Sequence, residues 1–426
     1  MVASQFRVVI VGAGPTGATL ALLLSQRGIS VTLVESARNF RRAFRGEALM
    51  PSGLQALAQM DLLALVPTLP HRPLDGWEFV INDRRLFLAE EPFEPDGPPC
   101  TLISQPAFLE AVVQRCQAGS QFEFLAGQAA QDLLWGAMGA PTPVGKDDRV
   151  SGIRLRDGRA IAADLVIATE GRQSLLRQRA QLALTEAPHD FDLLWFQLPD
   201  HPHLQAHNIF TSYLKDRQAF GLFRSAEGNL QVGLILPSRT PDRQSPTSEL
   251  GLQTLMAAAP PWLAQHCATH AATIEKPTFL PVRIGLCAQW SRPGFLLLGD
   301  AAHPMSPIRA QGINMALRDA IVAANVLVPI LTSGDLASSS PDSLTQWHRA
   351  IDAVLPQIQA ARYPEIQQIQ KLQAEETQLA TRLRDNAGLR SLVSGISPWC
   401  SQPIKTIWQQ KQRSLRQGTI EIRLTS

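Results

Sequence analysis

Residues 7–17 read Arg-Val-Val-Ile-Val-Gly-Ala-Gly-Pro-Thr-Gly, and this stretch decides the fold. The β-branched run 7–11 is typical of a buried parallel strand. The glycine-rich turn after it leads into an Ala/Leu-rich helix that ends at Gly28. A second apolar run, 29–34, predicts another strand and is followed by Glu35. The chain is therefore expected to begin with a strand–helix–strand unit.

The spacing of these glycines fits a dinucleotide-binding turn. Gly12 permits the tight turn, Gly14 lets a pyrophosphate approach the backbone, and Gly17 lets the helix pack closely on the strand. Glu35, 18 residues after Gly17, can accept hydrogen bonds from ribose hydroxyls, and it would repel a 2′-phosphate. The site is therefore expected to hold FAD or NAD rather than NADP. The expected contacts are Gly12, Ala13, Gly14, Pro15, Thr16, Gly17, Glu35 and Ser36.

A second glycine-rich run, LGDAAHPMSPIRAQGIN at 298–314, lies far along the chain. A short strand, 294–298, precedes it, and an apolar helix, 313–331, follows it. An enzyme that binds only NAD has no obvious need for this second set of polar groups, whereas FAD has a ribityl chain and a flavin ring. Asp300 could accept hydrogen bonds from ribityl hydroxyls, and the helix start could stabilise negative charge on reduced flavin.

The rest of the chain predicts an α/β fold, with a Rossmann-type FAD-binding domain, an inserted β-rich substrate domain and a C-terminal helical segment. A helix is expected at 47–66, and strands dominate 190–290. Apolar residues recur at helical spacing over 342–384, where Pro356 and Pro364 are expected to kink or split the helix. The expected boundaries are 1–75, 101–180 and 285–335 for the FAD-binding domain, 76–100 and 181–284 for the β-rich domain, and 336–426 for the helical segment.

Composition narrows the class of protein. The net charge is +2 and only 18% of the 426 residues are charged, so a nucleic-acid partner is not expected. Five widely spaced cysteines indicate a reduced, cytoplasmic protein. No stretch of about 18–20 uninterrupted apolar residues is found, so no membrane span is expected. No metal site is predicted, because no nearby acid or cysteine completes a ligand set with His201, His203 and His207. The oligomeric state stays open.

Three motifs occur in a characteristic order: VIVGAGPTG with Glu35, DLVIATEGR at 164–172 with Ser174 and Arg177, and GDAAHPMSP followed by QGINMALRDA. Lesser matches are RGEAL from Arg45, QPAFL from Gln105 and the tail RSLRQGTIEIRLT. With these motifs the chain resembles the FAD-dependent monooxygenases of the para-hydroxybenzoate hydroxylase type. The likeness spans nearly the whole chain, and the order of three motifs is far more specific than any single one.

This resemblance implies an FAD-dependent oxidoreductase. NADH or NADPH would reduce the FAD, O2 would add to form a C4a-hydroperoxyflavin, and one oxygen atom would hydroxylate or epoxidise a small organic substrate. An aromatic or polyketide- or terpenoid-like compound is expected. Two alternatives stay open: a related FAD-dependent reductase or dehydrogenase without oxygen insertion, and a flavin-binding protein without turnover.

The resemblance also assigns residues. Arg38, Arg45, Gln105 and Ala130 fall where family members contact the cofactor, and Gly171 belongs to the middle motif. Asp300 would bind the ribityl chain, Gly312, Ile313 and Asn314 the ring, and Pro307 would lie near its reactive face. No catalytic base can be named. The candidates near the flavin are Pro307, Arg309 and Tyr213, of which Tyr213 would either orient a substrate hydroxyl or pack within a strand.

Three residues depart from the family pattern. Glu170 stands where an aspartate is usual, and Ala310 stands where a glycine is common. Arg309 is unusual so near the flavin; it could stabilise anionic flavin, bind an acidic substrate or face solvent.

Overall fold

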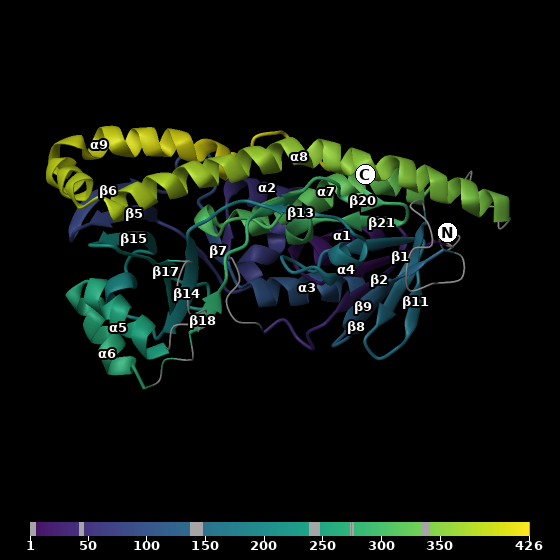
Figure 1. The fold of residues 1–426 in the computed structure, drawn as a ribbon, viewed down its shortest axis with the longest axis horizontal. Helices are drawn as coiled ribbons and strands as arrows, with labels where there is room; N and C mark the ends of the chain where they lie inside the picture. Colours follow the sequence, from purple (N-terminus) through teal and green to yellow (C-terminus); the bar gives the residue numbers. More distant parts are fainter. Residues whose placement is uncertain are drawn as a thin grey trace.

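The computed structural model describes residues 6–41, 47–136, 148–237, 248–272, 274, 277–333 and 341–425. Figure 1 shows two regions of sheet, side by side, with long C-terminal helices running along both. The predicted combination of Rossmann-type domain, β-rich region and C-terminal helices is confirmed. The domain boundaries stay a prediction.

The first sheet is built around the opening strand–helix–strand unit. Its order is β20-β21-β12-β1-β2-β8, and all neighbours are parallel except β20 with β21. The strands are β1 (Arg7–Val11), β2 (Ser30–Glu35), β8 (Phe122–Ala126), β12 (Leu165–Ala168), β20 (Ser291–Arg292) and β21 (Phe295–Leu297). Central placement of β1 puts its carboxyl end, and the turn after it, beside β12 and β2. This is the edge where open α/β sheets bind ligands.

Three helices bury the apolar face of this sheet. They are α1 (Pro15–Ser25), α3 (Gln105–Gln117) and α7 (Gln311–Leu331), and α1 contacts both of the others. Together with the strands they form the largest apolar core, to which Trp347 and Ile351 of the C-terminal helices also belong. Residues of α7 and of the C-terminal segment therefore complete the core of the first domain.

The prediction of a helix over 47–66 is wrong at both ends. Residues 48–49 form strand β3 (Ala48–Leu49), and α2 (Pro51–Gln59) begins only at Pro51, a residue suited to the first helical turn. Asp61 then has a left-handed φ of 57°, which ends the helix. A short 3₁₀ helix, η1 (Leu63–Thr68), follows.

Three smaller sheets are also present among the described residues. One has the order β3-β7-β4, another β11-β10-β9, and β13 pairs with β19. Their strands are β4 (His71–Pro73), β7 (Thr101–Ile103), β9 (Ala130–Trp135), β10 (Val150–Leu155), β11 (Ala160–Ala162), β13 (Leu184–Glu186) and β19 (Gly285–Cys287). The short helices α4 (Leu175–Arg179), η2 (Pro202–Leu204), η3 (Gly299–Ala301) and η4 (Ile308–Ala310) lie in the connections.

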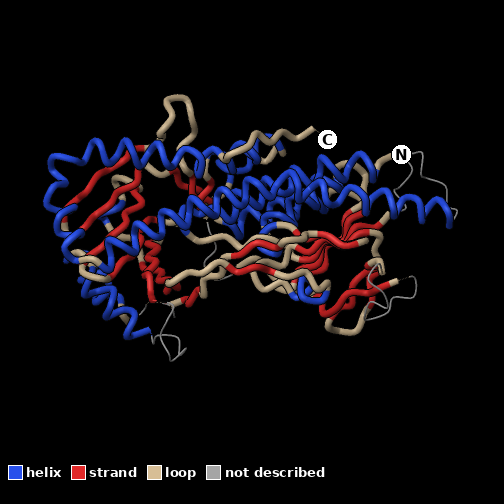
Figure 2. The backbone as a smooth tube through the Cα atoms, turned by 45° about the horizontal axis from the view of Figure 1, so that its top comes forward, coloured by secondary structure: helices blue, strands red, loops and turns tan. Residues whose placement is uncertain are grey.

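The second region is a seven-stranded sheet of order β18-β14-β17-β16-β15-β5-β6. Its strands are β5 (Gly76–Ile81), β6 (Arg84–Glu90), β14 (Phe191–Leu198), β15 (Ile209–Lys215), β16 (Gln218–Arg224), β17 (Leu230–Pro237) and β18 (Thr278–Leu280). Helices α5 (Ser248–Ala258) and α6 (Pro261–His270) share an apolar cluster with its central strands. Figure 2 separates this sheet from the first one clearly.

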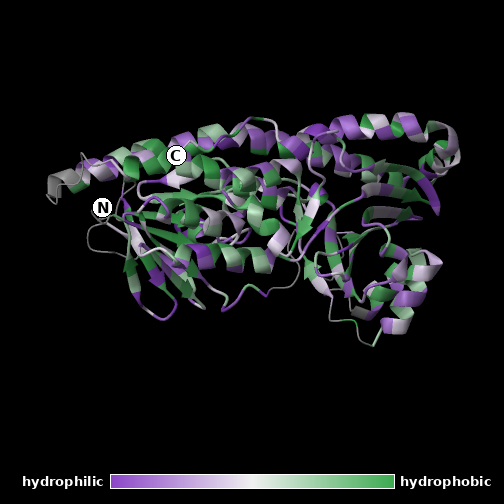
Figure 3. Ribbon diagram, turned by 180° about the vertical axis from the view of Figure 1, so that it is seen from behind, coloured by the Kyte–Doolittle hydropathy of each residue, from purple (hydrophilic) through white to green (hydrophobic). Residues whose placement is uncertain are grey.

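The C-terminal segment forms two helices, α8 (Pro341–Asp385) and α9 (Ala387–Gln417). The expected split at Pro356 or Pro364 does not occur: α8 continues as one helix with both prolines inside it. Contacts along the helix hold it in place: Asp352 accepts hydrogen bonds from Arg149 and Gly294, and Gln359 binds the backbone at Trp290. Figure 3 shows mixed polar and apolar residues along these helices, in keeping with one packed and one exposed face.

Residues 308–331 form a stretch that is long and apolar enough to cross a membrane by length and composition. The run of apolar residues is nevertheless interrupted by polar ones such as Arg318 and Asp319, so it does not reach the uninterrupted length on which the sequence-based expectation depended. Within the protein, however, 78% of the most apolar window is buried. The stretch, which contains α7, is a core helix, as its apolar sequence also indicated.

Candidate active site

The turn after β1 has the geometry that its glycines predict. Gly12 has a φ of +103°, and a Cβ there would lie 2.5 Å from the carbonyl oxygen of Thr169. A Cβ on Gly17 would lie 1.9 Å from the carbonyl oxygen of Gly12, so helix α1 can approach the turn only because residue 17 is glycine. A Cβ on Gly14 would meet no atom within 4 Å. Gly12 and Gly17 therefore serve close packing, whereas Gly14 faces open space.

Glu35 at the end of β2 is tied to this turn. Its Oε2 accepts a hydrogen bond from the N–H of Ala13 at 3.0 Å. Its Oε1 accepts one from the N–H of Ala37 at 2.8 Å and one from the hydroxyl of Ser36 at 3.1 Å. These donors fix a buried carboxylate beside the glycine turn. With the phosphates of a dinucleotide bound at the turn, a ribose hydroxyl could donate a hydrogen bond to this carboxylate.

The late glycine run returns to the same place. A Cβ on Gly299 would lie 2.6 Å from the hydroxyl oxygen of Thr16, so η3 touches the start of α1. The next residue, Asp300, forms an ion pair with Arg172, with 3.3 Å between Nε and Oδ2. Arg172 belongs to the middle motif that follows β12. The three motifs therefore meet in space, as the resemblance predicted.

The loop before α7 is strained. Arg309 and Ala310 both have left-handed φ values, 58° and 49°, a conformation that costs energy for residues other than glycine. This explains why glycine would be common at position 310. Asn314 in the first turn of α7 stabilises the loop, because its side-chain amide donates to the carbonyl oxygens of Ala310 and Ala48. Its Oδ1 accepts the N–H of Met50.

The glycine turn, Glu35, Asp300 and the loop before α7 open onto one cavity of about 2040 Å³. Pockets for drug-sized ligands span roughly 300–1,000 Å³, so there is room for a dinucleotide and a substrate together. The predicted residues that line it are Gly12, Ala13, Gly14, Pro15, Thr16, Glu35, Ser36, Gln105, Ala130, Gly171, Asp300, Pro307, Gly312 and Ile313, with the candidates Arg309 and Tyr213.

Three of the predicted cofactor contacts do not line the cavity. Gly17 lies in α1 and is buried against the glycine turn, and the Asn314 side chain is buried against β3 and the loop before α7. Arg38 is exposed beside Gly127 and is not among the lining residues. Arg45 lies outside the described residues.

Beyond the loop 307–310 the cavity becomes an aromatic chamber. The aromatic residues that line it come from β5, β6, β14, β15, β16, β18 and α9: Trp77, Phe79, Phe87, Trp195, Phe210, Tyr213, Phe220, Phe223, Phe279 and Trp408. Tyr213 stacks on Phe220 with 4.7 Å between ring centroids, and burial raises the pKa of its hydroxyl to about 12. The chamber favours a flat, largely apolar molecule.

Arg309 is the prominent charge in this chamber, and its side chain is only 7% exposed. Its guanidinium lies 4.9–5.3 Å from the ring centroids of Trp77, Phe79 and Trp408. It also forms an ion pair with Glu376 of α8, whose other oxygen accepts from Gln412 of α9. The reading of Arg309 as a solvent-facing residue is therefore wrong. Sequence reasoning missed Glu376 and Trp408, because both lie on helices with no local motif.

Glu170, the other departure from the family pattern, stabilises a helix start. Its Oε2 accepts hydrogen bonds from the hydroxyl of Ser174 at 2.6 Å and from the N–H of Leu176 at 3.1 Å. Burial raises the pKa of this carboxyl, and the two hydrogen bonds oppose that shift. Glu170 also lines the cavity. Its side chain ties the segment that carries Gly171 and Arg172 to the start of α4.

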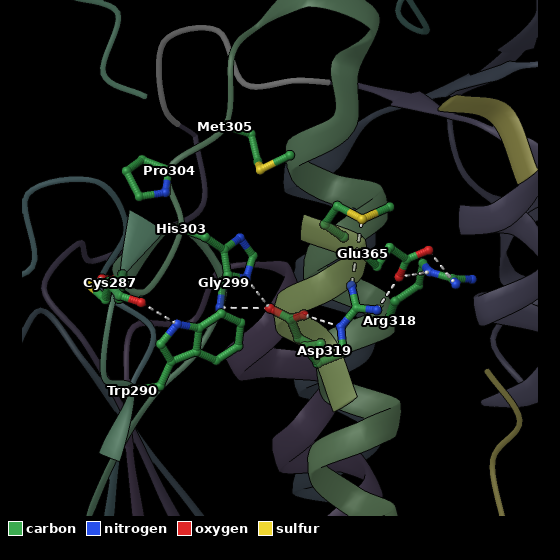
Figure 4. Close-up of polar contacts among 12 residues, drawn as sticks. Cys287, Trp290, Gly299, His303, Pro304, Met305, Arg318, Asp319 and Glu365 are labelled. Atoms are coloured by element: carbon green, nitrogen blue, oxygen red, sulfur yellow. Dashed lines mark hydrogen bonds and ion pairs between the residues drawn. The ribbon is translucent and has the colours of Figure 1, made fainter. Parts of the chain in front are cut away.

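A buried ionic network supports the late loop from behind (Figure 4). Asp319 of α7 accepts hydrogen bonds from the N–H of Gly299 at 2.9 Å and from Arg362 of α8 at 2.7 Å, and its Oδ2 lies 2.7 Å from Nε2 of His303. Glu365 binds Arg362 and Arg318, which gives two buried carboxylates and two buried guanidiniums. Burial alone would raise the pKa of Asp319, but the charges and hydrogen bonds of His303 and Arg362 lower it to about 2.

A family model described as an FAD binding domain matches residues 5–343. The chain belongs to this family. It is 30% identical over 378 residues to 6-methylpretetramide 4-monooxygenase of Streptomyces rimosus, covering 87% of this chain and 84% of the relative. It is 24% identical over 347 residues to 3-demethoxyubiquinol 3-hydroxylase of Escherichia coli K12, covering 78% and 82%. The first relative is named as a monooxygenase and the second as a hydroxylase. This chain is an FAD-dependent oxidoreductase of the monooxygenase class.

Solved structures share the fold. PqsL of Pseudomonas aeruginosa superposes with a TM-score of 0.70 at 22% identity, covering 92% of this chain and 99% of PqsL. 2-Methyl-3-hydroxypyridine-5-carboxylic acid oxygenase superposes with a TM-score of 0.67 at 22% identity, covering 90% and 93%. The resemblance drawn from the three motifs is thus confirmed for family, fold class and cofactor type.

Proposed function

We propose that this protein uses NADH or NADPH and O2 to add one oxygen atom to a hydroxylated aromatic substrate held in the chamber of β5, β15, β16 and α9. The observation that carries the proposal is the single cavity in which the glycine turn, Glu35, Asp300 and the start of α7 share a wall with about ten aromatic side chains. The relative from Streptomyces rimosus, named for oxygenation of 6-methylpretetramide, supports this class of reaction.

The residues present fit FAD. Gly14 and Gly171 both face space in which a Cβ would meet no atom within 4 Å, so the backbone is open to a ligand on two sides of the cavity. We assign the ADP half to the turn 12–16 and Glu35, with Gln105 and Ala130 beside it. Asp300 would hold the ribityl chain and Gly312 and Ile313 the ring. Bound FAD supplies the redox chemistry that activation of O2 requires.

The protein's own part is positioning and exclusion of water. The aromatic walls bury a flat substrate, and Pro307, Ile308 and Met305 make the nearby wall apolar. Leu250, Leu379 and Ile407 line the cavity and are also exposed, which supports an apolar entrance. A dry chamber protects a reactive oxygen donor from side reactions. The five unpaired cysteines support our placement of the protein in the reducing cytoplasm.

A rapid-mixing experiment tests this function. The FAD-loaded protein is reduced with NADH, NADPH or dithionite and mixed with O2 while its visible spectrum is recorded. We expect a transient species with a spectrum between those of reduced and oxidised flavin, which free reduced FAD does not show under the same conditions. Direct one-step reoxidation under every condition would favour a reductase or dehydrogenase. Protein that refuses added FAD would overturn the flavin assignment itself.

A further inference from the structure

Glu47 is a half-buried residue in the wall of the cavity, and the assignments above leave its carboxyl group without a role. It comes directly before β3 and lines the cavity together with Ala48, Leu102 and Phe223. Its Oε2 is buried and has no hydrogen-bond partner within the described residues. A buried polar atom without a partner costs about 1–3 kcal/mol. A carboxyl kept at that cost in a ligand cavity is a candidate functional group.

The position of Glu47 is fixed from two sides. The next residue, Ala48, accepts a hydrogen bond from Asn314, which ties it to the first turn of α7, at 3.1 Å. On the other side, the backbone N–H of Ala226, in the turn between β16 and β17, hydrogen-bonds to the Glu47 carboxyl. Glu47 therefore bridges the helix start assigned to the flavin and the sheet assigned to the substrate.

We propose that Glu47 is the proton acceptor for a phenolic hydroxyl of the substrate, a role that rests on the proposed function. The substrate O–H bond breaks and its proton passes to the Glu47 carboxylate, while the electron pair stays on the substrate oxygen and is shared with the ring. The ring carbons ortho and para to that oxygen then react more readily with an electrophilic oxygen donor. As the ring regains aromaticity, its C–H proton leaves to water and Glu47 returns its proton to the substrate oxygen.

The surroundings of Glu47 suit this role. Burial and the negative charge of Glu227, in the same turn as Ala226, together raise its pKa to about 8, while the hydrogen bond from Ala226 opposes the shift. An ordinary glutamate, with a pKa near ~4.3, is a weak base toward phenols, whose pKa is near ~10 as in tyrosine. A general base works best when its pKa lies near the working pH, because a usable fraction of it is then ionised and that fraction binds a proton strongly. With a pKa of about 8, the ionised fraction of Glu47 at neutral pH is a stronger base than an ordinary glutamate.

Infrared difference spectra of the FAD-loaded protein test the carboxyl directly. We expect a protonated-carboxyl band that disappears with a midpoint near pH 8 in the wild type and is missing in Glu47→Gln. The band stays in Glu110→Gln, which changes an exposed carboxylate on α3. In Glu227→Gln the midpoint moves down. A wild-type spectrum with no Glu47-dependent band between pH 6 and 10 would overturn the proposal.

The acceptor role is tested with 7-hydroxycoumarin, a planar phenol whose phenol and phenolate forms absorb at different wavelengths. With excess FAD-loaded wild type, the phenolate form is expected at lower pH than with Glu47→Gln, and Glu47→Asp restores part of that shift. Phenolate midpoints equal in wild type, Glu47→Gln and free solution would contradict the role. FAD absorbance and the rate of flavin reduction by NADH or NADPH should not change in the control Glu110→Gln. Their absence from the wild type would show failure of the proposed function instead.

Discussion

Gly299 and Thr16 lie in contact, although most of the chain separates them in sequence: a Cβ on Gly299 would lie 2.6 Å from the Thr16 hydroxyl oxygen. This contact joins the late glycine run to the opening turn. It places Asp300 in the cavity that Gly12 and Glu35 also line. The two ends of a long dinucleotide can therefore be held by parts of the chain that no local pattern links.

Substitutions of Gly17 and Gly14 should have different effects, the first on stability and the second on FAD binding. Gly17→Ala places a Cβ 1.9 Å from a backbone oxygen; we expect a loss of roughly 1–3 kcal/mol in the free energy of unfolding. Gly14→Ala meets no protein atom and keeps an ordinary φ of −74°. We expect unchanged stability without FAD but about ten- to a hundredfold weaker FAD binding, measured by denaturation and by flavin fluorescence. Equal effects of both substitutions on stability would contradict the placement of Gly14.

Asp319 should make the free energy of unfolding depend on pH in the acid range. Its pKa is about 2 in the folded protein, below the unfolded value of about 3.9. Its contribution is therefore fully present above pH ~4 and is lost as the pH falls from ~4 to ~2. The shift corresponds to about 2–3 kcal/mol. Urea denaturation at pH 5 and pH 3 should show a larger decrease for wild type than for Asp319→Asn.

Asp319→Asn should also lower the free energy of unfolding at neutral pH. Asp319→Asn leaves the buried Arg362 with only Glu365, which Arg318 shares, as a partner carboxylate. Breaking a buried ion pair costs about 3–5 kcal/mol. Asp192→Asn, in the half-buried pair with the N–H of Val282, is a milder comparison. An Asp319→Asn protein as stable as wild type at pH 7 would rule out a supporting role for the network.

Arg309 should act on substrate rather than on the flavin potential. Glu376 neutralises its charge, and three aromatic rings surround it in the substrate chamber. In Arg309→Lys the charge stays but the planar stacking is lost. We expect weaker binding of aromatic ligands in Arg309→Lys and Arg309→Ala, with little change in the flavin midpoint potential. A large shift of that potential in Arg309→Ala with unaltered ligand affinity would reverse this assignment.

The length of the Glu170 side chain should contribute to the stability of the protein. In Glu170→Asp the carboxylate is one methylene shorter and cannot reach both Ser174 and Leu176. The loss of one hydrogen bond at a helix start costs about 1 kcal/mol. Thermal denaturation should show this decrease, and Glu170→Gln, which keeps the length and one acceptor oxygen, should show a smaller one. A Glu170→Asp protein more stable than the wild type would contradict this role of the longer side chain.

Local patterns predicted the parts of the site that local geometry dictates. The strand, the turn and the roles of Gly12, Gly14 and Gly17 follow from the steric needs of a few neighbouring residues. The surroundings of Arg309 did not follow, because Glu376 and Trp408 lie on helices whose sequence shows only amphipathic spacing. The continuity of α8 across Pro356 and Pro364 also depends on distant contacts, such as those of Asp352 and Gln359. Asn314 was expected at the ring, but its side chain is used to hold β3.

The most direct measurement is a crystal structure of the protein with bound FAD. The account predicts one FAD per chain, with its adenosine ribose hydrogen-bonded to Glu35, its pyrophosphate at Gly14 and its flavin ring beside Gly312 and Ile313. A flavin ring located away from the loop 307–313, or an adenosine ribose remote from Glu35, would contradict it.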